Sequence, residues 1–255
     1  MSTHLTLAFY IPEPAEFQKG MRFFEILDGC APDLSPQKFG NHQPLKIPFE
    51  HGRSNKLREN WRWPFFWTRV KPRVNGCVLP SPPKVVHSSF EMVMQFTSAN
   101  AAKSRLVLEE VSKQFCPDFA FLHPYSEADQ ARGSANSSLI VLQKGKNYYV
   151  SVPAWVLGKF IPDLYQITIF GTAYVGHFGL KKLLSAPAAS VKQLTESCVC
   201  IQLLDSLTDR SDGLKILEET RAAVKKHLGE DSFFDAQKGP TFAYATPKFV
   251  ENRFR

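Results

Sequence analysis

The chain has 255 residues, of which 44% are hydrophobic and 22% are charged, a composition that excludes a mostly disordered protein. Five scattered cysteines exclude a disulfide framework and favour reduced thiols in a cytoplasmic protein. The formal net charge is +7. The most apolar later region, residues 150–180, contains prolines and charged residues, so it cannot cross a bilayer as one helix of ~20 apolar residues.

The first predicted elements are a strand and a helix. Apolar and other residues alternate over residues 5–11, which is the period of a strand. Residues 17–27 then carry an apolar stripe at spacings of three and four, which predicts a helix. The N-terminus has neither a basic start nor a long apolar run, so we expect no signal peptide.

Residues 31–83 form an irregular excursion with no sustained helical stripe and many prolines. An irregular segment of this length is unusual in a compact domain. Three interpretations remain open: a functional loop, a partly disordered segment, or a series of short strands.

Nearly all of the net charge lies within this excursion. Residues 53–73 contain seven of the 31 basic residues and one of the 24 acidic residues, so this segment alone carries +6. The charge is therefore a property of one segment, and such a concentration predicts a surface that meets an oppositely charged partner.

The same segment contains the sequence WRWPFFWTR, residues 61–69. Its aromatic residues at positions 61, 63, 65 and 67 would share one face of a strand. Pro64 has no N–H to donate, so we expect this strand at an edge of a sheet. Arg and Trp are frequent binding hot spots, and edge strands often bind other proteins. The predicted partner-binding residues are Arg58, Arg62, Arg69, Lys71, Arg73, Trp61 and Trp63.

A nucleic-acid-binding module is the alternative function for segment 53–73. Cations that neutralise phosphates and aromatic faces that stack bases are the components of such a module. The even spacing of the aromatic residues favours a strand that covers a core over a stacking platform.

The rest of the chain alternates strands and helices. Phe90, Met92 and Met94 share one face of a predicted strand, and Glu91 and Gln95 share the other. The further predicted elements are a helix over 99–115, a strand over 119–122, a hairpin over 139–152, a short helix from 154 to 160, a strand near 164–171, a short helix over 180–184, a strand over 198–204 and a helix over 211–228.

These elements predict an α+β fold: one domain over residues 1–255, with a mixed, largely antiparallel sheet flanked by helices. The order strand, helix, excursion, strand, helix, strand permits a ferredoxin-like N-terminal half. The polar loop at 126–138 is the best candidate for an internal boundary.

We expect no catalytic residue, cofactor site or metal site. The chain has no G-x-S-x-G elbow and no zinc-type spacing of Cys and His. His123, Glu127 and Asp129 lie in one loop, and an acid–base site there is the weaker interpretation beside ordinary loop polarity.

Gly171 and Gly176 have the spacing of the first half of a phosphate-binding loop. His177 and Phe178 occupy the positions where that loop requires Lys and Ser or Thr. We therefore expect these glycines to serve tight turns and close backbone packing.

Several stretches resemble the immunity protein 52 family of bacterial polymorphic-toxin systems. They are FGTAYVGHFGLKKLLSAP at 170–187, VCIQLLDSLTD, the helix ending KKHLGEDSFF, ATPKF, the opening LAFYIPEPAEF, and LHPYSEAD. No motif of the family matches residues 31–83. The resemblance implies a cytoplasmic antitoxin without enzymatic activity that binds a cognate toxin, typically a restriction-endonuclease-fold nuclease delivered by a contact-dependent or type VI secretion route.

The positive charge of segment 53–73 is the opposite of what a nuclease inhibitor usually presents, because such inhibitors often imitate DNA with acidic side chains. Three possibilities follow for such a partner. The protein does not plug the phosphate-binding cleft, or residues 53–73 dock on acidic groups of the toxin such as its metal-binding carboxylates, or it blocks assembly of the toxin from a distance.

Overall fold

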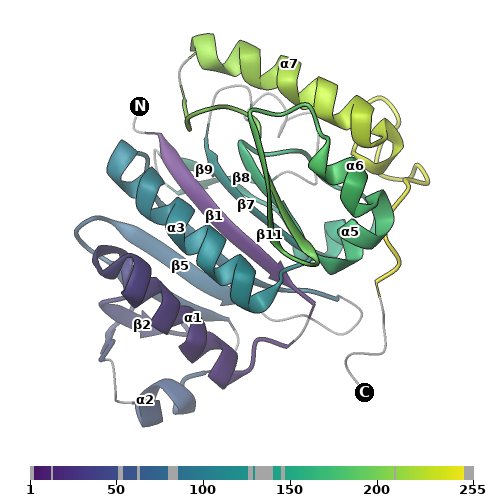
Figure 1. Cartoon of the computed structure of the whole chain (residues 1–255). Coiled ribbons are helices and arrows are strands. Elements are labelled where there is room, and N and C mark those ends of the chain that lie inside the picture. Colours follow the sequence, from purple (N-terminus) through teal and green to yellow (C-terminus); the bar gives the residue numbers. More distant parts are fainter. Residues whose placement is uncertain are drawn as a thin grey trace.

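A ten-stranded antiparallel sheet forms the centre of the molecule (Figure 1). The computed structural model describes residues 3–12, 14–50, 54–61, 64–79, 86–125, 129, 140–144, 147–209 and 211–249. Within these residues the strand order is β11-β12-β10-β7-β1-β6-β5-β4-β2-β3, and a separate hairpin pairs β8 with β9. The predicted α+β class with helices flanking a largely antiparallel sheet is confirmed.

The N-terminal half has a ferredoxin-like arrangement. Its elements are β1 (His4–Ile11), α1 (Phe17–Cys30), β5 (Val74–Leu79), β6 (Ser88–Gln95), α3 (Ser98–Phe115) and β7 (Phe119–Pro124). Their four strands lie in the order β7-β1-β6-β5. Along the chain, α1 lies between β1 and β5, and α3 lies between β6 and β7, as in a split βαβ fold. Both helices lie on the same face of the sheet (Figure 1).

Local sequence explains both ends of α3. The Thr97 hydroxyl accepts a hydrogen bond from the Asn100 N–H at 3.1 Å, which caps the first turn. Cys116 ends the helix in the left-handed conformation with φ of 42°, and Pro117 follows, which cannot continue a helix.

The excursion at 31–83 consists, in its described part, largely of short strands. They add to the edge of the ferredoxin-like half beyond β5. The elements are η1 (Pro32–Leu34), β2 (Lys38–Gly40), β3 (Ile47–Pro48), α2 (Ser54–Glu59) and β4 (Phe65–Arg69). Of the three interpretations left open by the sequence, short strands describe this segment.

The prediction of an edge strand beginning at Trp61 is wrong. The strand β4 begins at Phe65 and pairs with β5 on one side and β2 on the other, so it lies inside the sheet. Pro64 precedes the strand and its missing N–H costs no ladder bond. Phe65 and Trp67 do share a buried face, with exposed fractions of 2% and 1%.

The C-terminal half extends the sheet on the other side of β7. Its elements are β8 (Ile140–Lys144), β9 (Asn147–Ser151), η2 (Ala154–Gly158), β10 (Ile167–Phe170), α5 (Thr172–Phe178), α6 (Leu180–Leu184), β11 (Ser190–Thr195), β12 (Cys198–Gln202), α7 (Ser211–Leu228) and η3 (Glu230–Ser232). Strand β11 was not predicted. The candidate boundary at 126–138 lies, apart from Asp129, outside the described residues.

Two hydrophobic clusters lie on opposite faces of the sheet. Leu7 and Phe9 of β1 face the first cluster, with side chains of α1 and α3. Ala8 and Tyr10 of the same strand face the second cluster, with side chains of α5, α6 and α7. No described residue of β4, β5 or β6 belongs to this second cluster. The C-terminal layer therefore covers only part of its face of the sheet.

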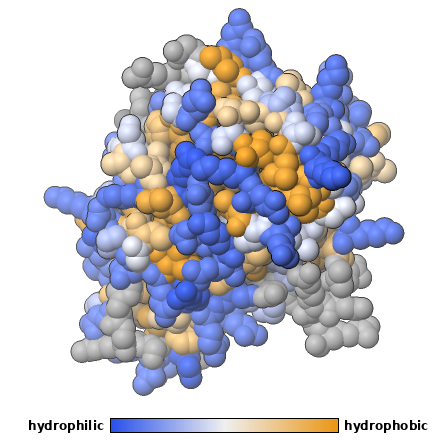
Figure 2. Space-filling model, viewed as in Figure 1, coloured by the Kyte–Doolittle hydropathy of each residue, from blue (hydrophilic) through white to orange (hydrophobic). Residues whose placement is uncertain are grey.

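The outer surface of the α1 and α3 layer is largely hydrophilic, with separate apolar patches (Figure 2). Leu106 of α3 contributes to the apolar surface, with 54% of its area exposed. Within the described ranges, no helix combines the length and apolar character needed to span a membrane.

Gly171 marks a close approach between two backbones. A side chain at this position would collide with the carbonyl oxygen of Pro117, and the Gly171 N–H donates to the Asp118 carbonyl at 2.8 Å. By contrast, Gly176 in the middle of α5 has open space where a side chain would stand. The expected close backbone packing is confirmed at Gly171.

We predict opposite effects for alanine at these two glycines. Gly171→Ala should lower the free energy of unfolding by about 1–3 kcal/mol, because the backbone of residues 117–118 must move. Gly176→Ala is the matched control and should raise it by about 0.5–1 kcal/mol through helix propensity. Urea unfolding followed by circular dichroism measures both; equal effects of the two variants would contradict the close approach.

Candidate functional site

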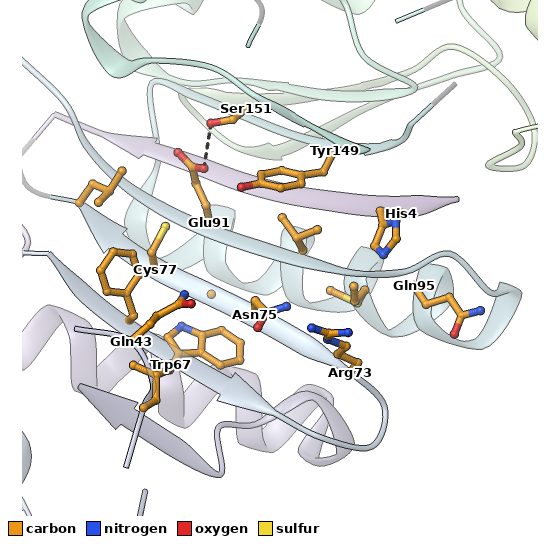
Figure 3. A pocket seen from close by; sticks show the side chains of 16 residues that line it. His4, Gln43, Trp67, Arg73, Asn75, Cys77, Glu91, Gln95, Tyr149 and Ser151 are labelled. Atoms are coloured by element: carbon orange, nitrogen blue, oxygen red, sulfur yellow. Dashed lines mark hydrogen bonds between the residues drawn. The ribbon is translucent and has the colours of Figure 1, made fainter. Parts of the chain in front are cut away.

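A pocket of about 540 Å³ lies on the sheet face opposite α1 and α3. Strands β4, β5 and β6 line its floor, and Tyr149 and Ser151 of β9 line one side (Figure 3). It occupies the part of the sheet that the C-terminal layer leaves uncovered. Its volume lies within the range of ~300–1,000 Å³ typical of small-molecule sites.

Strand alternation determines which side chains reach this pocket. Val74, Gly76 and Val78 of β5 are buried, while the alternate residues Asn75, Cys77 and Leu79 line the pocket. The same alternation on β6 places Glu91, Val93 and Gln95 in the pocket and the apolar residues between them in the core. The floor of the pocket is therefore the reverse side of the helix-covered core.

Antiparallel pairing brings these side chains into levels along the strands. Glu91 pairs with Cys77, and Val93 pairs with Asn75. Since Val74 pairs with Met94, Arg73 and Gln95 lie at the next level beyond them. Gln95 follows Glu91 by four positions along the strand, so the two levels are ~13 Å apart.

Glu91 is the buried charge of the site, with 8% of its surface exposed. One carboxylate oxygen accepts from the Ser89 hydroxyl and the other accepts from the Ser151 hydroxyl, both at 3.2 Å. Burial raises the pKa of Glu91 to about 7, although these two hydrogen bonds act in the opposite direction. Among the described side chains, no cation forms an ion pair with this carboxylate.

The groups around Glu91 are neutral at ordinary pH. Burial, and secondarily the Glu91 charge, raises the pKa of Tyr10 and of Cys77 well above their usual values. The Tyr149 pKa is also raised, chiefly by burial. None of these three neutral groups supplies a counter-charge to the Glu91 carboxylate.

The turn between β4 and β5 lies at the other end of the pocket. Arg73 is exposed and lines the pocket there. The Arg69 guanidinium donates to the Ser35 carbonyl at 3.1 Å and to the Lys71 carbonyl at 2.9 Å, so it fixes the turn. Lys71 is exposed, and Val70 at the tip has 66% of its surface exposed.

Two other predicted partner-binding residues lie against α1. The Trp61 indole N–H donates to the Ala15 carbonyl at 2.8 Å, and its ring occupies the space over Gly20. The Arg58 guanidinium lies 5.0 Å from the ring centre of Phe17, a cation–π contact. Trp61 is thus part of the packing between α1 and β4, while Arg62 and Trp63 lie outside the described residues.

The predicted set does not form one surface. Arg58 and Trp61 contact α1, whereas Lys71 and Arg73 belong to the β4–β5 turn. The rings of Phe65 and Trp67 are buried and are not available to stack nucleic-acid bases, which removes these two rings from the aromatic platform that the alternative function requires.

His123 lies in strand β7 and not in a loop as predicted, and its side chain and that of Asp129 are buried. His123 is 0% exposed and Asp129 is 7% exposed. The His123 Nε2 lies 3.1 Å from both carboxylate oxygens of Asp129, and the Gln166 N–H donates to its Nδ1 at 3.4 Å. Glu127 lies outside the described residues. This geometry favours a structural histidine, and the described residues hold no cluster of three potential metal ligands.

The fold is similar to that of a T6SS protein. The structure matches the Pseudomonas aeruginosa T6SS protein PA0821 with a TM-score of 0.51 over 88% of this chain and 73% of the other. The two sequences are 11% identical, so the likeness shows the fold alone. No family model matches the chain, and no curated protein matches it.

Sequence reasoning missed the pocket. The alternation over residues 88–95 correctly placed Glu91 and Gln95 on the face opposite Phe90 and Met92, yet that face was not linked to Arg73 or to β9. A charged residue in the middle of an apolar strand was the one available signal, because such a position is unusual for a purely structural strand.

The pKa of Glu91 predicts an unusual dependence of stability on pH. The unfolded chain releases this proton near pH 4.5 and the folded protein holds it to about pH 7. Folding therefore becomes less favourable as pH rises between these values, by up to roughly 3 kcal/mol, and the penalty is complete above pH 7. Glu91→Gln should be more stable than the wild type at pH 8 and equally stable at pH 4.5.

Urea unfolding of both proteins at these two pH values tests this prediction. Glu219→Gln on the exposed face of α7 is the matched control, and its effect should be small and equal at both pH values. If Glu91→Gln is less stable than the wild type at pH 8, Glu91 has a counter-charge and the prediction is wrong.

Proposed function

We propose that this chain is a T6SS-associated immunity protein that binds and neutralises a cognate toxin through a protein–protein interface, without catalysis of its own. The fold likeness to a T6SS protein over 88% of the chain is the observation that carries the proposal. The resemblance of residues 170–187 and the other stretches to the immunity protein 52 family supports the neutralising role. On that resemblance, the toxin is a nuclease of restriction-endonuclease fold.

The family-like motif at 170–187 forms part of the scaffold. The stretch at 170–187 includes Gly171, which allows a close backbone approach, and the helices α5 and α6. These residues build the C-terminal layer, with Tyr174 and Leu183 buried in the second cluster. Their contribution is to the scaffold, which leaves contact with the toxin to other surfaces.

The β4–β5 turn is the surface that we assign to the toxin. It combines exposed Val70 with the cations of Lys71 and Arg73, and Arg69 holds its shape. An apolar tip followed by two cations suits an acidic partner surface, because electrostatic complementarity speeds association and an apolar contact slows dissociation. The metal-binding carboxylates of a nuclease are such a surface.

Co-expression with the toxin encoded by the adjacent gene tests the function. We expect rescue of the host, a 1:1 complex on purification, and inhibition of the purified toxin that is complete at equimolar protein. Absence of both rescue and complex formation would end the proposal. Inhibition by far less protein than toxin would indicate an enzymatic activity and contradict a purely binding role.

Charge reversal at the turn tests the interface. The double variant Lys71→Glu, Arg73→Glu should weaken toxin binding about tenfold or more, mainly through slower association at low salt. Lys215→Glu, Lys226→Glu on the exposed side of α7 is the matched control and should bind like the wild type. Surface plasmon resonance at two salt concentrations measures both; equal binding by the two double variants would place the interface elsewhere.

A further inference from the structure

We propose that the pocket between β4–β6 and β9 binds an arginine or lysine unit, with its side-chain cation on Glu91 and its free carboxylate at the Arg73 end. The ligand is a free basic amino acid or the C-terminal residue of a peptide, which present the same two charged groups. This inference does not rest on the proposed function, because the pocket lies in one chain and needs no toxin.

The Glu91 end of the pocket suits a cation. Each carboxylate oxygen accepts one hydroxyl hydrogen bond, and an ionised carboxylate has about four acceptor positions. Burial makes the unpaired charge costly. A guanidinium or ammonium group offsets that cost and donates to the remaining acceptor positions, and a guanidinium does so with two parallel hydrogen bonds.

The middle of the pocket suits a chain of methylene groups. Val93 of β6 and Tyr149 of β9 line the pocket here, and Phe66 of β4 lies at the Glu91 level. Apolar surfaces of this kind accommodate the aliphatic part of a Lys or Arg side chain, whose charged end lies beyond.

The far end of the pocket provides donors for an anion. Arg73 and Gln95 line it, and Asn75 lines the pocket one level nearer the middle. Figure 3 shows Arg73 and Gln95 at the end away from Glu91. An arginine guanidinium binds a carboxylate with a pair of hydrogen bonds. The ~13 Å of strand between the two levels, less one hydrogen-bond contact at each end, is close to the span of an extended basic amino acid.

This charge order discriminates among small molecules. Glu91 repels anions that lack a cation, and Arg73 repels diamines that lack a carboxylate. A ligand with a cation at one end and a carboxylate at the other satisfies both ends.

Isothermal titration calorimetry of the full chain at pH 8 tests the proposal. L-Arginine or L-lysine should bind. L-Citrulline, which lacks the cation, and agmatine, which lacks the carboxylate, should each bind at least tenfold more weakly than L-arginine. No heat from arginine or lysine at millimolar concentration, or equal affinity for citrulline, would overturn the proposal.

Two variants assign the ends of the ligand. Glu91→Gln should weaken arginine binding at least tenfold, while its thermal unfolding at pH 8 establishes that it is folded. Arg73→Gln should weaken arginine binding and strengthen agmatine binding, because the charge that repels the agmatine amine is removed. Lys215→Gln is the control and should bind like the wild type. Wild-type affinity in Glu91→Gln would overturn the assignment of the cation.

Titration with the tripeptide Gly-Gly-Arg, which has a free carboxylate, distinguishes a peptide C-terminus from a free amino acid as the ligand. Binding at least as tight as that of arginine identifies a peptide C-terminus, whereas binding much weaker than that of arginine identifies the free amino acid. The amidated tripeptide should bind at least tenfold more weakly than the free acid, and equal binding would overturn the role of Arg73.

Binding should strengthen as pH rises from 5.5 to 8, because Glu91 gains its charge across this range. The other titratable groups near Glu91 are Tyr10 of β1, Cys77 of β5 and Tyr149 of β9. His4 of β1 and Arg73 of the β4–β5 turn line the pocket at its far end. Of these, a histidine ordinarily titrates in the same range, so His4→Gln separates the two. The dependence should persist in His4→Gln and disappear in Glu91→Gln, and the reverse result would overturn the proposal.

Discussion

The structure depends on how the two faces of one wide sheet are covered. Strand β1 is buried on both faces, with Leu7 and Phe9 toward α1 and α3 and Tyr10 toward the C-terminal layer. The Tyr10 hydroxyl donates to the Val152 carbonyl at 2.8 Å, which ties the chain after β9 to the middle of the sheet. The hydrophobic effect drives this coverage, because an uncovered apolar sheet face is unfavourable in water.

The coverage stops at β6, and the character of the side chains changes there. On the pocket side of β5 and β6, Asn75, Glu91 and Gln95 replace the apolar residues found on the reverse side. A polar floor tolerates water, so this part of the sheet remains stable without a third layer. The same polarity gives the pocket its chemistry, and its buried carboxylate lies beside Ser151, at the end of β9.

Sequence periodicity was sufficient for the long elements. The stripes of α1, α3 and α7 and the alternation of β1 and β6 each extend over many residues, so local pattern and burial agree. The short strands β2 and β3 gave no such pattern, because two or three residues are too few to establish a period. The position of Trp61 was predicted wrongly because its even spacing from Phe65 matched a strand. Its side chain instead packs against α1, about 40 residues earlier in the chain.

The pocket depends on contact between β9 and β6, which are about 60 residues apart in the chain. Periodicity carries no information on contacts between residues so far apart in the sequence.

The alternation of β5 has a consequence for how such a protein diversifies. On one side of this strand, Gly76 leaves the space that the Trp67 indole fills, so substitution there disturbs the scaffold. On the other side, Asn75 and Cys77 line the pocket and belong to neither hydrophobic cluster. Alternate residues of this strand are thus under separate selection: the residues that face the core for the fold, and the residues that face the pocket for recognition. A lineage carrying this sheet is free to change what the pocket accepts by substitutions that leave the core, and the rest of the molecule, unaltered.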